Sequence, residues 1–201
     1  MNIRLLLFLF LLLPLVACDR GPRLTPLAAD AVILAFGDSL TYGTGAGTGE
    51  AYPAVLQNLL DRIVINAGMP GELSATGLAR LPALLDEHRP ALVILCHGGN
   101  DLLQQRDPEE LAANLRAMVG LARAAGADVV LVGVPQPGLL LQTAPLYAGI
   151  AKELHLPFAD DIIADTLQRP SRKSDYVHPN GKGYAEIAAA LVELIHQAEK
   201  K

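Results

Sequence analysis

The chain has 201 residues and a formal net charge of −5 at pH 7, with 51% apolar and only 4% aromatic residues. This length allows one domain with a sizeable core and is short for two. The acidic balance and the lack of a basic stripe in the sequence argue against a nucleic-acid partner.

Residues 1–17 have the pattern of a signal peptide. Arg4 precedes the apolar run LLLFLFLLLPLV, which is too short for a comfortable transmembrane helix and has the length of a signal-peptide core. The segment ends in LVAC, which resembles a bacterial lipobox, where cleavage precedes the cysteine and the sulfur of Cys18 is lipidated. A plain cleavable signal peptide also tolerates this sequence, but a cysteine directly after a small residue favours lipidation. We therefore expect a bacterial envelope protein, anchored to a membrane at Cys18 and facing the periplasm or the exterior.

Residues 18–30 comprise Cys18 and a polar, proline-containing stretch without periodicity, which predicts a tether. Residues 31–201 are then the folded domain. The second cysteine, Cys96, lies in the apolar run ALVILC and is predicted to be a buried, inert side chain, so no disulfide is expected. The five histidines lack the paired spacing of zinc ligands, and we expect no metal and no cofactor.

Short apolar runs alternate with longer segments of helical spacing after residue 30. Strands are predicted at 31–36, 63–66, 91–96, 128–133 and, more weakly, 157–160. Helices are predicted at about 50–62, 75–88, 108–125, 143–154 and 181–199. Strands that are apolar throughout and alternate with helices indicate a parallel sheet covered on both faces. The predicted fold is an α/β domain of three layers, α/β/α, with about five strands in flavodoxin-like order.

Polar residues and glycines follow three of the predicted strands and precede the last predicted helix. GDSL contains Ser39, NAG contains Gly68, GGND contains Asn100, and DYVH contains Asp175 and His178. In a parallel sheet of this order, the ligand site lies at the carboxyl ends of the strands. The first three turns are therefore expected side by side, with the fourth folded back over them.

The residue types in these turns suit acyl transfer. A serine hydroxyl is a weak nucleophile until a base removes its proton, and an imidazole oriented by a carboxylate is such a base. Asp175 and His178 are close enough in sequence for a tight turn to join them. The N–H groups of Ser39 and Gly68 and the side-chain amide of Asn100 are neutral donors of the kind that stabilise an oxyanion.

Together and in this order, the four segments resemble the GDSL, or SGNH, hydrolase family. The resemblance implies that Ser39 is the nucleophile, that Gly68 and Asn100 complete the oxyanion hole with the Ser39 N–H, and that Asp175 and His178 complete a catalytic triad. It implies hydrolysis of carboxylic esters or thioesters through an acyl-serine intermediate, with no cofactor.

The resemblance covers about residues 35–184 and is strongest to the bacterial thioesterase I, lysophospholipase and arylesterase group. It rests on AFGDSLTYGTG, a tyrosine-proline helix start and HPNGKGY after the histidine. The polar residue His97 directly before GGND is unusual, and its role stays open, as does that of Cys96.

Residues 135–147 form a proline-flanked segment that carries Leu139, Leu140 and Leu141. Three exposed leucines on a loop would be unusual, so they either pack as a plug of the core or line an acyl pocket. The leucine run resembles the acyl-contacting loop of the thioesterase-like group, which favours the pocket.

Two further functions remain open, an envelope carbohydrate O-deacetylase of the same family and a non-catalytic surface lipoprotein. The intact set of Ser39, Asp175 and His178 argues against the second. The glycines within 43–49 match neither the dinucleotide-binding nor the P-loop fingerprint and predict a flexible turn. We expect a monomer that acts on a small-molecule ester or thioester.

Overall fold

The computed structural model describes residues 21–138 and 141–200. The predicted signal peptide, Cys18, Leu139 and Leu140 lie outside the described residues. A parallel five-stranded sheet forms the centre of the domain, in the order β2-β1-β3-β4-β7. Its strands are β1 (Val32–Gly37), β2 (Ile63–Gly68), β3 (Leu92–Cys96), β4 (Asp128–Val132) and β7 (Phe158–Ala159). The predicted parallel sheet and flavodoxin-like order are confirmed, and the weakly predicted fifth strand is present as a two-residue strand.

The central strands are buried on both faces, which explains their continuous apolar sequences. All five residues of β3 are buried, and β1 is buried from Ile33 onward. In the edge strand β2, exposed and buried side chains alternate more, with Ile63 exposed and Val64 buried. Strands buried on both faces by helices lose the alternation that a half-exposed strand shows.

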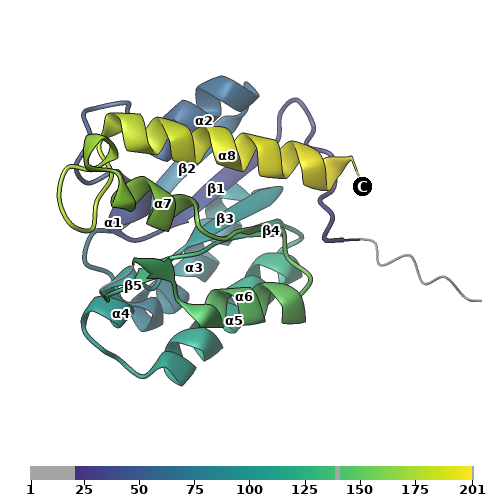
Figure 1. Ribbon diagram of the computed structural model, residues 1–201. Helices are drawn as coiled ribbons and strands as arrows, with labels where there is room; N and C mark the ends of the chain where they lie inside the picture. Colours follow the sequence, from purple (N-terminus) through teal and green to yellow (C-terminus); the bar gives the residue numbers. More distant parts are fainter. Residues whose placement is uncertain (1–20, 139–140, 201) are drawn as a thin grey trace, which may run out of the picture.

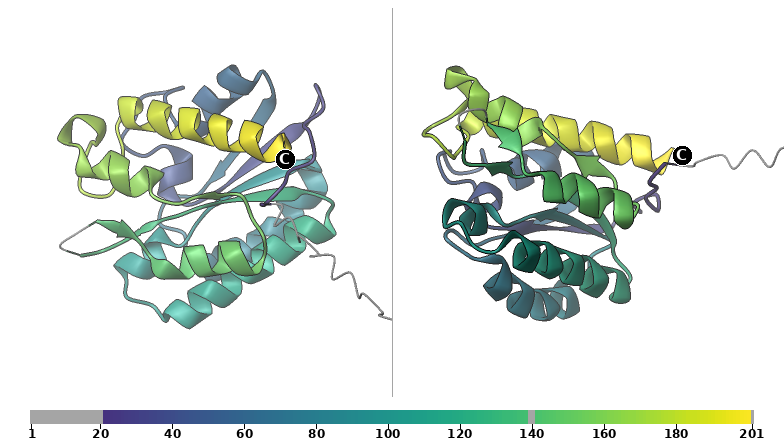
Figure 2. Two further views of the ribbon diagram at one scale, coloured as in Figure 1. Left: turned by 45° about the vertical axis from the view of Figure 1, so that its right-hand side comes forward. Right: turned by 60° about the horizontal axis from the view of Figure 1, so that its bottom comes forward.

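Helices cover the two faces of the sheet, as Figures 1 and 2 show. On one face α2 (Tyr52–Leu60) packs against α8 (Gly181–Glu199), which also contacts α7 (Ile162–Gln168). On the other face α5 (Pro108–Ala124) packs between α3 (Ser74–His88) and α6 (Pro145–Glu153). The five long helices expected from periodicity are thus present within about two residues of their predicted ends.

Several short elements at the carboxyl ends of the strands were not predicted. They are α1 (Ser39–Tyr42), α4 (Gly99–Leu103), the two-stranded hairpin of β5 (Pro135–Gln136) and β6 (Gln142–Thr143), and the 3-10 turn η1 (Pro170–Arg172). The longer α7 was missed as well. Elements of two to seven residues are too short for hydrophobic periodicity to reveal them.

The second half of the predicted tether is part of the domain, so the expectation of an extended linker over 18–30 is wrong there. Leu24 is buried, and its N–H donates to the Ala198 carbonyl at 3.2 Å. The Thr25 N–H donates to the Asp128 carboxylate at 2.7 Å. Asp128 begins β4, so this segment lies at the amino ends of the strands, beside the end of α8 (Figure 1). Leucine burial and backbone pairing hold it there despite its polar composition.

Candidate active site

Ser39 lies at the point where the chain order of the sheet reverses. β1 runs between β2 and β3, and Ser39 is the first residue of α1, directly after β1. Asp38 precedes it and caps α1 by accepting a hydrogen bond from the Leu40 N–H at 3.1 Å. The other Asp38 oxygen accepts from the Gly99 N–H at 3.1 Å, which ties this turn to the start of α4. Burial raises the pKa of Asp38, and the neighbouring charges and donors offset only part of this effect.

A tight loop between η1 and α8 carries Asp175 and His178. The Ser174 N–H donates to the His178 carbonyl at 2.9 Å, and an antiparallel bridge joins Lys173 and Pro179 at its base. The Asp175 carboxylate accepts from the Val177 and His178 N–H groups at 2.8 Å each. Backbone hydrogen bonds therefore fix the carboxylate relative to the ring.

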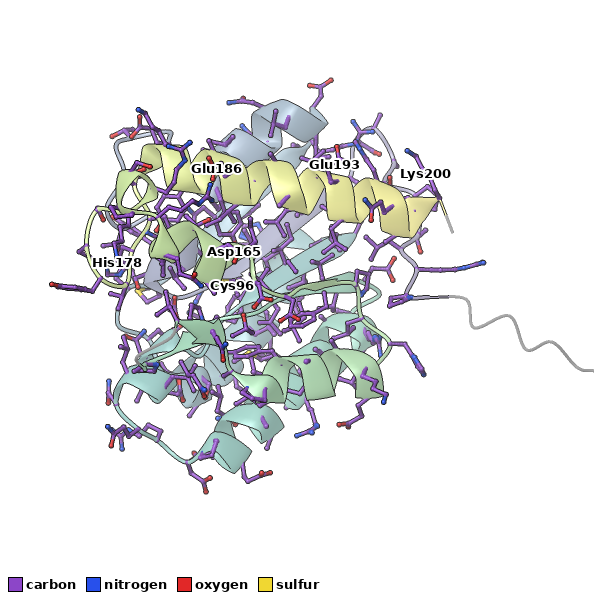
Figure 3. The ribbon with its side chains drawn as sticks, in the orientation of Figure 1. Cys96, Asp165, His178, Glu186, Glu193 and Lys200 are labelled. Carbon is purple, nitrogen blue, oxygen red and sulfur yellow. The ribbon has the colours of Figure 1, made fainter. Side chains whose placement is uncertain are left out.

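The structure brings Ser39, His178 and Asp175 together, as expected from the sequence. His178 Nε2 lies 3.0 Å from Ser39 Oγ, and His178 Nδ1 lies 2.8 Å from Asp175 Oδ2. Figure 3 shows His178 in the loop at the end of the molecule opposite Lys200, the carboxyl-terminal end of α8. A serine and a carboxylate on opposite ring nitrogens form the arrangement of a nucleophile, a base and an orienting group.

The carboxylate of Asp175 stays ionised in this arrangement. Burial by itself raises its pKa, but the hydrogen bonds from the His178 ring and from two N–H groups outweigh this and lower the pKa below its ordinary value. An ionised carboxylate accepts only, so Nδ1 of His178 carries the proton. Nε2 is then the acceptor that faces the Ser39 hydroxyl.

Gly68 does not occupy the predicted position in the oxyanion hole. Its N–H donates to the Asn66 side-chain oxygen at 3.0 Å, and it is absent from the residues that line the cavity beside Ser39. A Cβ at Gly68 would lie 2.0 Å from the Tyr42 N, so this glycine allows β2 to pack closely against the end of α1. The assignment of Gly68 as a donor to the oxyanion is therefore wrong on this geometry.

Gly71 takes that place three residues later. It lines the cavity with Ser39 and Asn100, has a φ of +79°, and would meet no atom within 4 Å if it carried a Cβ. Within the described residues, no acceptor takes the N–H of Gly71 or that of Ser39. The signal that sequence reasoning missed is the Pro70-Gly71 dipeptide, a turn marker just beyond β2.

Asn100 is placed as predicted, in the first turn of α4 and on the wall of the cavity. One hydrogen of its side-chain amide goes to the Glu72 carbonyl, at 3.0 Å from Nδ2. The second hydrogen of the same amide is left for the cavity. Three neutral donors, on Ser39, Gly71 and Asn100, thus line one cavity beside the serine hydroxyl.

A cavity of about 460 Å³ opens beside Ser39 and is lined mostly by apolar side chains. Leu141 is one of them, and it also packs against the edge of the hydrophobic core. Leu103, Val134, Leu167 and Tyr176 line it as well and come from four different parts of the chain, which is why the sequence did not reveal them. An apolar cavity with a few convergent polar groups is the usual form of a small-molecule site.

The glycine-rich loop over 43–49 packs against the loop that carries the histidine. A Cβ at Gly45 would lie 2.0 Å from the Ser174 Oγ, and Gly45 has a φ of +93°. Residues 43–49 thus support the His178 loop by close approach. In residues 21–138 and 141–200, no group of three or more His, Cys, Asp or Glu side chains is placed to hold a metal ion.

Residues 35–186 match the GDSL-like Lipase/Acylhydrolase family. This chain belongs to that family. Two curated relatives are Esterase TesA of Pseudomonas aeruginosa, 45% identical over 57% of this chain and 59% of the relative, and Thioesterase 1/protease 1/lysophospholipase L1 of Escherichia coli K12, 34% identical over 80% of this chain and 81% of the relative. The match to the first spans less than two thirds of its length.

A solved structure agrees with the architecture described above. The psychrotrophic esterase EstA from Pseudoalteromonas sp., inhibited by monoethylphosphonate, superposes with a TM-score of 0.75 and 26% identity, over 84% of this chain and 98% of EstA. Membership of the GDSL-like family and the names of these relatives support a serine ester hydrolase activity.

No helix within residues 21–138 and 141–200 has both the length and the apolar character needed to cross a membrane.

Proposed function

We propose that this protein hydrolyses carboxylic esters or thioesters through an acyl-Ser39 intermediate. The observation that carries the proposal is the Ser39–His178–Asp175 chain of hydrogen bonds, at 3.0 and 2.8 Å. Beside it lie the N–H groups of Ser39 and Gly71, which have no acceptor among the described residues, and the Asn100 amide, which donates one of its two hydrogens to the Glu72 carbonyl. Family membership and the esterase and thioesterase names of the relatives support it.

The proposed reaction has two halves. Ser39 Oγ attacks the substrate carbonyl carbon while its proton passes to His178 Nε2, and the oxygen that becomes negative is bound by the donors of Ser39, Gly71 and Asn100. His178 returns the proton to the departing alcohol or thiol, which leaves the acyl group on Ser39. It then takes a proton from water, which attacks the acyl carbon, and gives that proton back to Ser39 as the acid is released.

The test is hydrolysis of p-nitrophenyl esters by the protein without its predicted signal peptide, with the Ser39→Ala variant assayed in parallel. Loss of the nucleophile should lower kcat by at least about 10⁴-fold with the fold unchanged. Equal activity in both proteins would exclude Ser39 as the nucleophile.

For the substrate, we propose an aryl, short-acyl or lysophospholipid ester or an acyl thioester, rather than a sugar acetate. The support is the apolar lining of the cavity, with Leu141 on the hairpin and Leu103 on α4. A panel of p-nitrophenyl esters from acetate to longer chains distinguishes these classes, and Leu141→Ala should raise KM more for longer chains than for acetate. A native enzyme that accepts acetate alone would favour the O-deacetylase.

We also propose that Cys18 carries a lipid and holds the domain at a bacterial envelope membrane. The LVAC sequence supports this. Leu24, which is buried in the domain, is six positions after Cys18, a reach of about 20 Å at full extension. Leu24 lies at the amino ends of the strands, so the cavity would face away from that membrane. Cys18→Ser should move the protein from the membrane fraction to the soluble fraction, and retention of this variant on the membrane would contradict lipidation.

A further inference from the structure

A cluster of three ionisable side chains, two of them buried and one partly exposed, lies behind the proposed oxyanion hole and has no part in the reaction above. It consists of Glu72, Arg80 and His97, which we name the rear cluster. His97 is fully buried, and the Glu72 side chain is only 3% exposed. Arg80 donates to both Glu72 carboxylate oxygens, from Nε at 2.9 Å and Nη2 at 2.7 Å.

One ring nitrogen of His97 contacts Glu72 of the rear cluster, and the other accepts a hydrogen bond from the backbone of the next residue, Gly98. The Gly98 N–H donates to Nδ1 at 2.8 Å, so Nδ1 is the acceptor. The proton must then lie on Nε2, which is 3.2 Å from a Glu72 carboxylate oxygen. His97 thus donates to a carboxylate that Arg80 already binds, and the imidazole is held without a net charge on the ring.

The helix opposite His97 is shaped to receive the ring. A Cβ at Gly77 would lie 2.3 Å from His97 Nε2, so an alanine at this position of α3 would displace the imidazole. Glycine inside a helix costs about 1 kcal/mol relative to alanine. Glycine at position 77 therefore lowers the stability of α3 but leaves space for the His97 ring.

Glu72 connects the rear cluster to the proposed site. Its backbone carbonyl accepts a hydrogen bond from the Asn100 amide at 3.0 Å, and the preceding residue, Gly71, lines the cavity. The Glu72 carbonyl can hold the Asn100 amide only if the Glu72 backbone is itself fixed. The Glu72 N–H donates to the Met69 carbonyl at 3.2 Å, and the bonds from Arg80 and His97 to the Glu72 carboxylate add to that constraint.

We propose that His97 is a positioning residue, which holds Glu72 and, through the Glu72 carbonyl, orients the Asn100 amide toward the reacting oxygen. This inference rests on the proposed function. A donor displaced by a fraction of an ångström stabilises the transition state less while the ground state binds equally well, so the effect belongs in kcat.

The first test compares three substitutions at His97. His97→Leu removes both ring contacts and should lower kcat by about 10-fold to 100-fold, with KM within about 2-fold. His97→Gln keeps an amide donor that reaches Glu72 and should recover at least half of the native kcat. His97→Asn is too short for that contact and should behave like the leucine variant. A glutamine variant no better than leucine, or a leucine variant with native kcat, overturns the proposal.

The second test combines His97→Leu with Asn100→Ala. If His97 acts through Asn100, the fold-loss caused by His97→Leu should be at least about 3-fold smaller once the amide is absent. The same fold-loss in both backgrounds would show that His97 acts elsewhere and overturns the inference. All kcat values are normalised to the folded fraction measured by circular dichroism at the assay temperature.

Two controls separate the possible failures. Ile195→Ala removes buried apolar atoms from the core side of α8, at the end of the helix remote from the cavity. It should lower the free energy of unfolding without lowering kcat. Asn100→Ala by itself should lower kcat by about 10²–10³-fold. If Ser39→Ala and Asn100→Ala keep native activity, the proposed function fails. If both lose activity while the double-variant test shows no coupling, only the role of His97 fails.

Discussion

The two carboxylate oxygens of Asp175 have different hydrogen-bond partners. Together these bonds hold the loop between η1 and α8, which carries Asp175 and His178, in one arrangement. One oxygen accepts two backbone N–H groups, and the other accepts the ring of His178. The loop therefore fixes both the position and the tautomer of the imidazole. Because the pKa of Asp175 is lowered, its carboxylate stays ionised well below neutral pH.

Asp175→Asn should lower kcat by about 10²–10⁴-fold while the fold is retained. An amide keeps the shape of the carboxylate but permits the wrong imidazole tautomer, in which Nε2 holds the proton and cannot accept one from Ser39. Steady-state kinetics on one p-nitrophenyl ester measures the effect. The matched control is Asp86→Asn, at an exposed position of α3, which should have native kcat. Native activity in Asp175→Asn would show that the carboxylate has no orienting role.

At the scale of elements, the approach of β1 to β3 brings Ser39 and Asn100 to one cavity. Gly37 at the end of β1 is paired with Cys96 at the end of β3. A Cβ at Gly37 would lie 1.9 Å from the Cys96 carbonyl oxygen and 2.4 Å from the Thr41 Oγ1. The absence of a side chain there lets the two strands end side by side directly below the site.

Gly37→Ala should lower the free energy of unfolding by at least about 2 kcal/mol, because the added methyl meets backbone that cannot move aside. Gly120→Ala is the matched control. Gly120 is an exposed residue of α5, and a Cβ added there would have no atom within 4 Å. A better helix former at that position should raise stability by about 0.5–1 kcal/mol. Urea unfolding of both variants measures the difference, and a neutral Gly37→Ala would contradict the close approach.

At the scale of the whole molecule, the chain uses the two ends of its sheet differently. The carboxyl ends of the strands carry the site, and the amino ends receive residues 24–27 beside the end of α8. The Leu27 N–H donates to the Glu199 carboxylate at 2.8 Å, which adds a third contact to those of Leu24 and Thr25. The start of the described chain is thereby fixed at the end of the molecule opposite the hairpin of β5 and β6 (Figure 2), and β5 lines the cavity.

A domain that begins at residue 31 should be less stable than one that begins at residue 21, by about 1–3 kcal/mol. The loss reflects exposure of the surface that Leu24 covers and removal of its hydrogen bonds. Its kcat should be unchanged, since the lost segment does not approach the cavity. Chemical unfolding and esterase assays of the two proteins check both statements, and a selective loss of kcat would contradict the separation of the two ends.

The stability of the domain should fall in acid partly through Glu72. Burial opposes ionisation of this carboxyl, but the bonds from His97 and Arg80 prevail and lower its pKa to about 2, against an ordinary 4.5. A lowered carboxyl pKa stabilises the fold fully above the ordinary pKa, and this contribution is lost as the pH falls from about 5 toward 2. Glu72→Gln should therefore be less stable than native protein at pH 7, with a smaller difference at pH 3. A difference independent of pH, measured by urea unfolding, would contradict this linkage.

The sequence alone determined the parallel sheet, the five long helices and the three side chains that form the Ser39–His178–Asp175 chain of hydrogen bonds. The strands and helices are visible in the sequence because apolar residues repeat with a regular spacing over many positions. Ser39, Asp175 and His178 are visible because they stand in short motifs whose residue types suit acyl transfer. Only the tertiary structure decided that Gly71 rather than Gly68 faces the cavity. The choice depends on where β2 ends and on which N–H is already taken by Asn66.

The tertiary structure also decided the position of residues 21–30 and the role we propose for His97. Polar composition suggested a free tether, but a buried leucine and three hydrogen bonds hold the segment in place. Its backbone N–H groups donate these bonds to one distant carbonyl and two distant carboxylates. His97 stood out in the sequence only as unusual. Its partner Glu72 is 25 positions away, and Arg80, which binds the same carboxylate, is 17 positions away. No local pattern specifies contacts between side chains that folding alone brings together.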